Sequence, residues 1–222
     1  VPISRRRSVT NKILNSDPSV EQVGFWVAPR GRADARLEMA GGELCGNALR
    51  SIGAVLAHEG GDGAFRIETE VLERPILVTV ESKRARIAFP KNIFTLSDDV
   101  CHLPGISHIL GDSFSAVDEK SVFKAYGLLS KKAAGLISYA KKGARYFIEP
   151  IVRVKSLSVS VRETACASGT LALAMYLYKK DGTKEFFVRQ PSGAVFDVSV
   201  GKSILTLSGP IRSIRRINGL KG

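Results

Sequence analysis

The hydrophobic and polar positions along this chain follow the same order in its two halves. Two apolar runs have the length of buried helices, and each begins at a cysteine: one spans residues 45–58 and the other residues 166–180. Polar segments with glycine end both runs, at Gly60–Gly63 and at Lys179–Gly182. Segments in which apolar and polar residues alternate follow each helix, as is typical of strands with one buried face. The pattern therefore predicts two similar units, each built from strands and one central helix.

Shorter elements are expected around these two helices. The pattern predicts one short helix over residues 8–16 and another over residues 118–131. A short strand is expected to end near Met39. Further strands are predicted over residues 21–29, 65–71, 76–82, 84–90, 106–110, 134–140, 144–152, 156–161, 184–190, 194–200 and 203–209. We interpret the repeat as an internal duplication, with a first lobe over residues 1–95 and a second over residues 96–209.

Two of the three cysteines occupy equivalent positions in the two halves. Cys45 lies in GGELCGNALRSIGAVLA, and Cys166 lies in RETACASGTLALAMYLY. A single cysteine at the start of an apolar helix is usually a small core residue. The matched surroundings of these two instead favour a pair of thiols that face one substrate. Cys101 has no such surroundings and is expected to be structural.

The composition narrows the possible classes of function. An odd and small number of cysteines argues against a disulfide framework and for a reducing compartment, so we expect a cytoplasmic protein. No apolar stretch is long enough to span a membrane, and the scattered histidines predict no metal site. The net charge of +12 comes from dispersed basic residues with short clusters, among them residues 212–216. Because aromatic residues do not alternate with these clusters, we expect a solvated surface that can steer carboxylates, and no nucleic-acid partner.

Small residues follow each cysteine and leave the first amides of each helix uncovered. These residues are Gly46, Asn47 and Ala48 in the first copy, and Ala167, Ser168 and Gly169 in the second. Amides at a helix N-terminus bind carboxylates, and the same field is expected to lower the pKa of a thiol placed there. With two such helix starts facing each other, one thiolate can remove the α-proton of an amino acid. The opposite thiol then delivers a proton to the other face. This chemistry requires no cofactor.

At these residues the sequence resembles the diaminopimelate epimerase-like superfamily of cofactor-independent amino-acid racemases and epimerases. LCGNALR is similar to the first cysteine motif of the family, and ETACASGT is similar to the second. The resemblance implies an α/β (α+β) fold of two pseudo-symmetric lobes, each a curled, mainly antiparallel sheet around a central helix. It also implies that residues 210–222 return to the first lobe. Cys45 and Cys166 are then the catalytic residues. The implied substrate-binding residues are Gln22, Gly46, Asn47, Glu163, Ala167, Ser168 and Gly169.

Within this superfamily the strongest likeness is to the branch of histidine racemases that serves opine-metallophore biosynthesis. EQVGF, the glycines before the first cysteine and Gln190–Gly193 after the second carry this likeness. The stretches that recognise diaminopimelate in its epimerases are replaced here by Glu38–Gly41 and Val159–Arg162. We therefore predict an amino-acid racemase, with histidine as the favoured substrate.

Three alternatives stay open. They are a diaminopimelate epimerase, a phenazine-type isomerase that works without the cysteine pair, and an inactive relative that only binds amino acids. The expected partner is a small amino acid, and the sequence leaves open whether the chain forms a homodimer.

Overall fold

The strands of the protein follow the alternation seen in the sequence. The computed structural model describes residues 1–114 and 117–215. In β4 (Ile76–Glu81), for example, every second side chain is buried, beginning with Ile76. β13 (Val195–Val200) has the same period of two. Since successive side chains of a strand point to opposite faces, such strands form a sheet with one face against a core.

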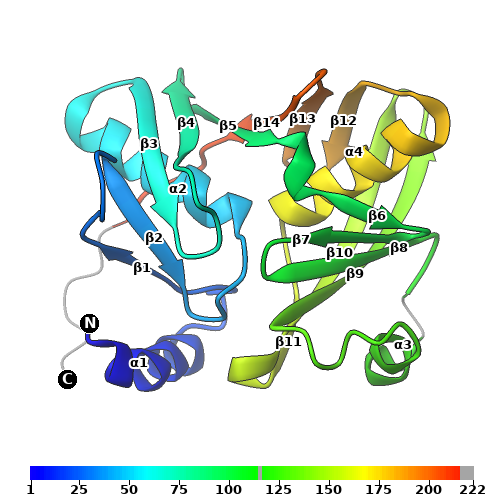
Figure 1. Cartoon of the computed structure of the whole chain (residues 1–222), viewed down its shortest axis with the longest axis horizontal. Helices are drawn as coiled ribbons and strands as arrows, with labels where there is room; N and C mark the ends of the chain where they lie inside the picture. Colours follow the sequence, from blue (N-terminus) through cyan, green and yellow to red (C-terminus); the bar gives the residue numbers. More distant parts are fainter. Residues whose placement is uncertain (115–116, 216–222) are drawn as a thin grey trace.

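The chain forms two halves that lie side by side (Figure 1). Besides β4, the first half contains α1 (Ile3–Ser16), β1 (Gly24–Val27), β2 (Ala35–Met39), α2 (Gly46–Gly60), β3 (Gly63–Thr69) and β5 (Arg84–Pro90). Besides β13, the second half contains the strands β6 (Thr95–Ser97), β7 (Val100–Leu103), β8 (Ile106–Gly111), β9 (Ala133–Lys142), β10 (Arg145–Val154), β11 (Val159–Arg162), β12 (Glu185–Arg189) and β14 (Ile204–Pro210). Its α-helices are α3 (Glu119–Ala125) and α4 (Ala167–Asp181), and its short 3-10 helices are η1 (Lys91–Ile93) and η2 (Lys155–Leu157).

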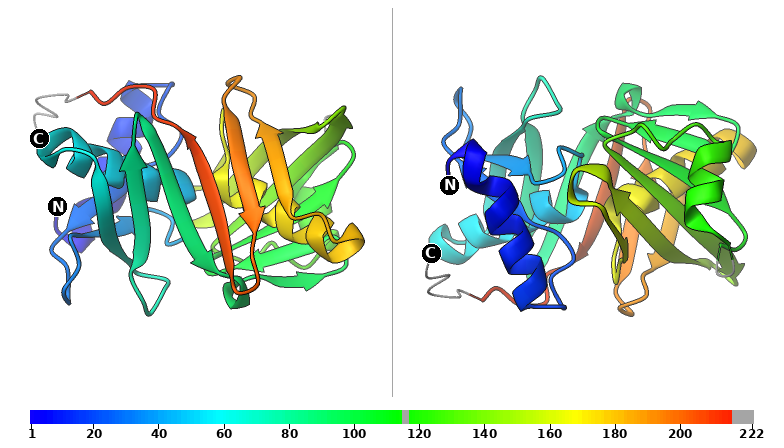
Figure 2. Two further views of the ribbon diagram at one scale, coloured as in Figure 1. Left: turned by 90° about the horizontal axis from the view of Figure 1, so that it is seen from above. Right: turned by 90° about the horizontal axis from the view of Figure 1, so that it is seen from below.

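One continuous sheet runs through both halves. Its order is β1-β2-β3-β4-β5-β14-β13-β12-β10-β9-β8-β7-β6, and β11 pairs with β10 beside this path. Most neighbours are antiparallel, and the parallel pairs are β2 with β3, β8 with β9, and β10 with β12. The antiparallel pair β5 and β14 joins the halves, as the view from above shows (Figure 2). The predicted fold class, a curled and mainly antiparallel sheet around a helix in each half, is confirmed.

The two cysteine-led helices lie inside the curled sheets. α2 packs against β2 to β5, and α4 packs against β7, β8, β9, β13 and β14. The first eleven residues of α4, from Ala167 to Leu177, are buried apart from Tyr176, because the sheet surrounds this helix on most sides. α2 leaves one face open to solvent, at Ser51 and His58. The core therefore holds each helix start at the line where the two halves meet.

Several predicted boundaries were wrong. The helix expected over residues 118–131 ends at Ala125, because Gly127 adopts a φ of 67° that does not continue a helix. The first helix begins at Ile3 rather than Ser8, directly after Pro2, since proline is tolerated at the start of a helix. The strands β6 and β7 were not predicted, because each is too short for alternation to show.

The described end of the chain lies along the first half. The amide of Ile211 donates to Lys83 O, and Arg50 Nη2 donates to Pro210 O. Residues 216–222 of the segment expected to return to the first lobe lie outside the described residues. The division into lobes near residue 95 stays a prediction.

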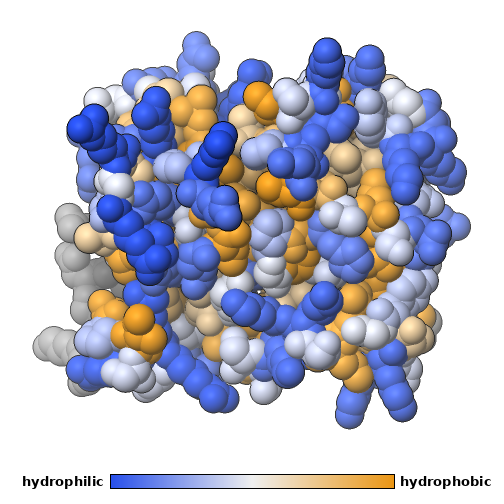
Figure 3. Space-filling model, viewed as in Figure 1, coloured by the Kyte–Doolittle hydropathy of each residue, from blue (hydrophilic) through white to orange (hydrophobic). Residues whose placement is uncertain are grey.

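The surface is mostly hydrophilic, with smaller hydrophobic areas between the polar side chains on the face shown in Figure 3. Among the described residues, no helix combines the length and the apolar composition that crossing a bilayer requires.

Candidate active site

Both cysteines of the duplicated motif occupy the N-cap position of their helices. Cys45 precedes α2 with extended backbone angles, and its Sγ accepts a hydrogen bond from the amide of Ala48 at 3.4 Å. Cys166 precedes α4 in the same conformation, and its Sγ accepts from the amide of Gly169 at 3.3 Å. Sulfur thus replaces the side-chain oxygen that usually caps a helix. The sequence repeat is therefore also a repeat of local geometry.

The two helix starts meet between the halves. A Cβ atom at Gly46 would lie only 2.8 Å from the Cβ of Ala167, so only glycine fits at position 46 without displacement of α4. One residue further along α2, Asn47 Nδ2 donates to Ala165 O at 2.6 Å. The other side-chain atom of Asn47, Oδ1, is buried and has no hydrogen-bond partner among the described residues. The amides that follow each cysteine therefore converge on one place.

A series of side chains, here called the thiol bridge, links the two sulfur atoms. Cys45 Sγ donates to Gln22 Oε1 at 2.6 Å, and Gln22 Nε2 donates to the Glu163 carboxylate. The carboxylate of Glu163 in turn lies close to the thiol of Cys166 and raises its pKa. The bridge consists of Cys45, Gln22, Glu163 and Cys166, and it crosses from the first half to the second.

Three neighbouring bonds close the site around this bridge. Gln22, Glu21 and Asn47 of the first half each bond to one of three successive residues of the second half. The first bond is the contact of Gln22 with Glu163 described above. In the second, Thr164 N donates to Glu21 Oε1 at 2.8 Å, and the third is the contact of Asn47 with Ala165 O. We call these three bonds the clasp. Both cysteines are buried behind it, with 5% of Cys45 and 2% of Cys166 exposed.

Burial decides the protonation of the thiols. Desolvation raises the pKa of Cys45 and of Cys166 well above the usual range of a thiol, and nearby carboxylates raise both pKa values further. The expected lowering of the thiol pKa by the helix start is therefore wrong for this closed arrangement. The hydrogen bonds from the helix amides do lower the pKa of each thiol, but the loss of hydrating water raises it by more. Burial also raises the pKa of Glu163 to about 7, so at neutral pH the carboxylate is the readier base.

His108 and Gln190, which the sequence analysis did not assign to the site, lie around Cys166 together with the predicted Ser168. Ser168 Oγ lies 3.5 Å from Cys166 Sγ and 3.0 Å from His108 Nε2. Burial lowers the pKa of His108 to about 3, which keeps its imidazole neutral. The amide of Cys166 donates to Gln190 Oε1 at 2.9 Å. The Gln-Pro pair at position 190 could have indicated this role, whereas nothing in the sequence around His108 did.

A second buried carboxyl group, Glu43, lies two residues before Cys45. It is 4% exposed, and its Oε2 has no hydrogen-bond partner among the described residues. Burial raises the pKa of Glu43 to about 7. Each half therefore supplies one carboxyl group of raised pKa close to its thiol. Across residues 1–114 and 117–215, no group of three or more His, Cys, Asp or Glu side chains could hold a metal ion.

Every residue proposed from the sequence for this site lies at the meeting point of the two helix starts. Gln22 and Glu163 belong to the thiol bridge, and Asn47 belongs to the clasp. The other four residues flank the cysteines directly: Gly46, Ala167, Ser168 and Gly169. Their roles in binding and catalysis stay predictions.

Comparisons with known proteins indicate the family. Residues 1–94 match the model of the "Histidine racemase CntK N-terminal domain" family. A histidine racemase of Fusobacterium nucleatum subsp. nucleatum is 30% identical over 218 residues, which cover 87% of this chain and 79% of that protein. The histidine racemase of another strain of this organism is 28% identical, over 87% of this chain and 78% of that protein.

Solved structures share the fold at low sequence identity. A predicted epimerase from Pseudomonas aeruginosa superposes with a TM-score of 0.66 at 14% identity, covering 100% of this chain and 90% of that one. A phenazine biosynthesis protein of the PhzF family from Enterococcus faecalis gives a TM-score of 0.58 at 13% identity, covering 95% of this chain and 85% of that one. The structural likeness concerns the fold, whereas the sequence likeness to the histidine racemases extends over 87% of this chain. The chain therefore belongs to the histidine racemase family.

Proposed function

We propose that this protein interconverts L- and D-histidine without a cofactor, with Cys45 and Cys166 as its two acid–base groups. The thiol bridge is the observation that carries the proposal. Hydrogen bonds lead from Cys45 through Gln22 to Glu163, whose carboxylate lies close to Cys166 at the point where two helix starts converge. The curated relatives named histidine racemases support the choice of substrate.

The helix starts account for binding of the amino-acid backbone. A substrate carboxylate would accept hydrogen bonds from free amides after Cys45 and Cys166, where the helix dipoles favour a negative charge. The orphan Oδ1 of Asn47 is a suitable acceptor for the substrate ammonium group. To reach this position the substrate must displace the Gln22 amide. The polar contacts that this amide makes in the closed site then become available to the substrate.

The inversion follows from thiols on opposite sides of the α-carbon. One sulfur, as thiolate, takes the α-proton, and the C–H electron pair stays on carbon as a carbanion. The opposite thiol gives its proton to the other face, so one S–H bond forms as the other breaks. The helix amides stabilise the charge that spreads onto the substrate carboxylate in this step.

Glu163 provides a route to the thiolate that burial otherwise disfavours. Its ionised carboxylate lies against the Cys166 thiol, and its pKa of about 7 leaves it largely ionised in mildly alkaline solution. Transfer of the Cys166 proton to this carboxylate moves one negative charge from oxygen to sulfur. Ser168 Oγ and the Gly169 amide then face the new thiolate.

Racemisation in heavy water tests the proposal. L-histidine in D2O should yield D-histidine that carries deuterium at the α-carbon. Chiral chromatography measures the D-histidine formed, and mass spectrometry measures its deuterium content. Cys45→Ala and Cys166→Ala should each lower kcat by at least about 10³-fold, the upper range of a proton-transfer group. Cys101→Ala is the matched control and should retain activity, since Cys101 lies on β7 outside the thiol bridge. Full activity in either of the first two variants would contradict the assignment.

A substrate panel separates the alternatives. Diaminopimelate should react at least tenfold more slowly than histidine, and the reverse order would favour a diaminopimelate epimerase. Binding of histidine without α-proton exchange would instead favour an inactive relative.

Location and assembly belong to the same proposal. We expect the protein in the cytoplasm, because two free catalytic thiols require reducing conditions. Light scattering of the purified protein decides between a monomer and a homodimer.

A further inference from the structure

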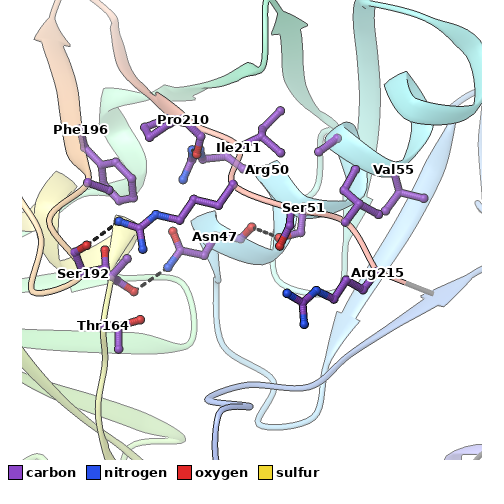
Figure 4. A pocket seen from close by; sticks show the side chains of 16 residues that line it. Asn47, Arg50, Ser51, Val55, Thr164, Ser192, Phe196, Pro210, Ile211 and Arg215 are labelled. Carbon is purple, nitrogen blue, oxygen red and sulfur yellow. Dashed lines mark hydrogen bonds between the residues drawn. The ribbon is translucent and has the colours of Figure 1, made fainter. Parts of the chain in front are cut away.

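A cavity lined by arginine lies outside the thiol bridge. It has a volume of about 420 Å³ and lies between α2, the segment after β14, the loop that precedes α4, and β13 with the turn before it. Arg50, Arg212 and Arg215 line it, together with Asn47, Thr164 and Ser192. Neither Cys45 nor Cys166 belongs to its lining. Figure 4 shows Arg215 directed from the C-terminal segment into the space opposite Thr164 and Ser192.

Among the described residues, no carboxylate pairs with the positive charge of this cavity. The described residues that line it include no aspartate or glutamate. The ion pairs among the described residues involve Arg6, Arg36 and Arg84, and none of the three arginines of the cavity. Arg212 Nη2 donates to Ser192 O, which is a backbone carbonyl.

The lack of a negatively charged partner is clearest at Arg50, because this residue is only 7% exposed. Its Nε donates to Ala85 O at 3.2 Å, its Nη2 donates to Pro210 O at 2.9 Å, and its guanidinium lies 4.6 Å from the centre of the Phe196 ring. These contacts satisfy hydrogen bonds but supply no counter-charge. Burying a charge without a partner of opposite sign is costly, and burial accordingly lowers the pKa of Arg50 to about 10.

The position of the cavity links it to both halves of the molecule. Arg50 belongs to α2, whereas Thr164 and Ser192 belong to the second half, and the amide of Ser192 donates to Thr164 O. Asn47 and Ala165, which form one bond of the clasp, also line it. A ligand here would contact both halves beside the clasp without touching the thiols.

We propose that this cavity binds a small organic oxyanion, a carboxylate or a phosphate, held by Arg50, Arg212 and Arg215. Guanidinium groups pair with both kinds of oxyanion through two parallel hydrogen bonds, and the serine and threonine residues of the lining add neutral donors. The apolar part of the wall, which includes Phe196, suits the carbon skeleton of such a ligand. The basic cluster near the end of the sequence thus has a specific role besides solvation of the surface.

Calorimetric titration with citrate and with inorganic phosphate, at constant ionic strength set by NaCl, tests this site. The wild-type protein should bind at least one of the two anions with saturation at one molecule per chain. In the double variant Arg212→Gln/Arg215→Gln, the association constant should fall at least tenfold. Stronger binding of citrate identifies a carboxylate site, and stronger binding of phosphate identifies a phosphate site.

The double variant Arg145→Gln/Arg189→Gln is the matched control, because it removes the same charge from exposed positions outside the cavity. It should bind as the wild-type protein does. Equal weakening in both double variants, or no saturable binding by the wild-type protein, would overturn the proposal. Cys45→Ala and Cys166→Ala should bind the anion normally, so failure of the racemase mechanism would not affect the outcome.

Discussion

Glu163 joins two groups that depend on its charge, the Gln22 amide and the Cys166 thiol. Its carboxyl is almost fully buried, and desolvation is the main cause of its raised pKa. A buried acid next to a nucleophile or base is a common way to set the pH at which an enzyme works. The ionisation of this single residue should therefore control the rate.

The first prediction concerns the pH dependence of racemisation. Below a pH of about 7 Glu163 is protonated and cannot accept the Cys166 proton, so kcat/KM should fall about tenfold per pH unit as the pH decreases. Glu163→Gln should lower kcat about 10²- to 10³-fold and remove the inflection near pH 7. Initial rates between pH 5.5 and 8.5 provide the measurement. Glu149→Gln, an exposed residue on β10, is the control, and an unchanged inflection in Glu163→Gln would exclude this role.

The second prediction concerns stability and Glu43. Its pKa is raised from 4.5 to about 7 on folding, so the folded state holds the proton more tightly than the unfolded state. Stability from this group is present below pH 4.5 and is lost as the pH rises to about 7. Glu43→Gln should therefore stabilise the protein by about 2 to 3 kcal/mol at pH 8 and by almost nothing at pH 4.5. Urea unfolding at both pH values measures the difference. Glu73→Gln at an exposed position should show neither effect.

At the scale of elements, the contact between α2 and α4 determines whether the two thiols face each other. Each helix is held by its own sheet, and the helix starts touch at Gly46 and Ala167. The contact leaves no free space for a larger side chain, because even one added methyl group disturbs a well-packed interior. The distance between the helix starts is therefore sensitive to the residue at position 46.

The third prediction follows from this contact. Gly46→Ala should destabilise the protein by about 1 to 3 kcal/mol and lower kcat, because the new methyl group pushes α2 away from α4. Gly60→Ala at the other end of α2 is the matched control, since its Cβ would meet no atom within 4 Å. That variant should leave kcat unchanged and stabilise the helix by roughly 0.5 kcal/mol. Thermal unfolding and racemisation assays compare the two, and equal behaviour would show that the contact is not critical.

At the scale of the whole molecule, the two halves are joined in two different ways. The β5 and β14 pair is a permanent sheet connection, whereas the clasp consists of side-chain contacts that can separate. Since both thiols are buried, the proposed mechanism predicts that the clasp opens when a substrate enters.

The fourth prediction tests the clasp through the reactivity of the thiols. Glu21→Ala removes the acceptor for Thr164 N and should increase the rate of alkylation of Cys45 and Cys166 by iodoacetamide several-fold. Mass spectrometry of the peptides follows each cysteine separately. Glu73→Ala should react at the wild-type rate, and histidine should protect both thiols. An unchanged rate in Glu21→Ala would mean that the clasp does not limit access.

The sequence by itself determined the repeat, the fold class and many of the residues that gather at the site, but not Glu21 or His108. Apolar periodicity is a local property, so the helices that follow Cys45 and Cys166 could be found without coordinates. The strand boundaries were less certain. The end of α3 was missed because the effect of Gly127 depends on its backbone angle.

Only the tertiary structure decided the electrostatics and the contacts between residues far apart in the chain. The sequence predicted a thiolate at each helix start, whereas in the structure both thiols are buried and protonated. Desolvation raises their pKa values, and its size depends on all the residues packed around each thiol. His108 and Glu21 joined the site because β8 and the loop before β1 bring them there. The uncompensated charge of Arg50 likewise exists only after folding, since in the sequence it is one of many arginines. Periodicity reports which face of an element is buried, but only packing decides which charges share a cavity.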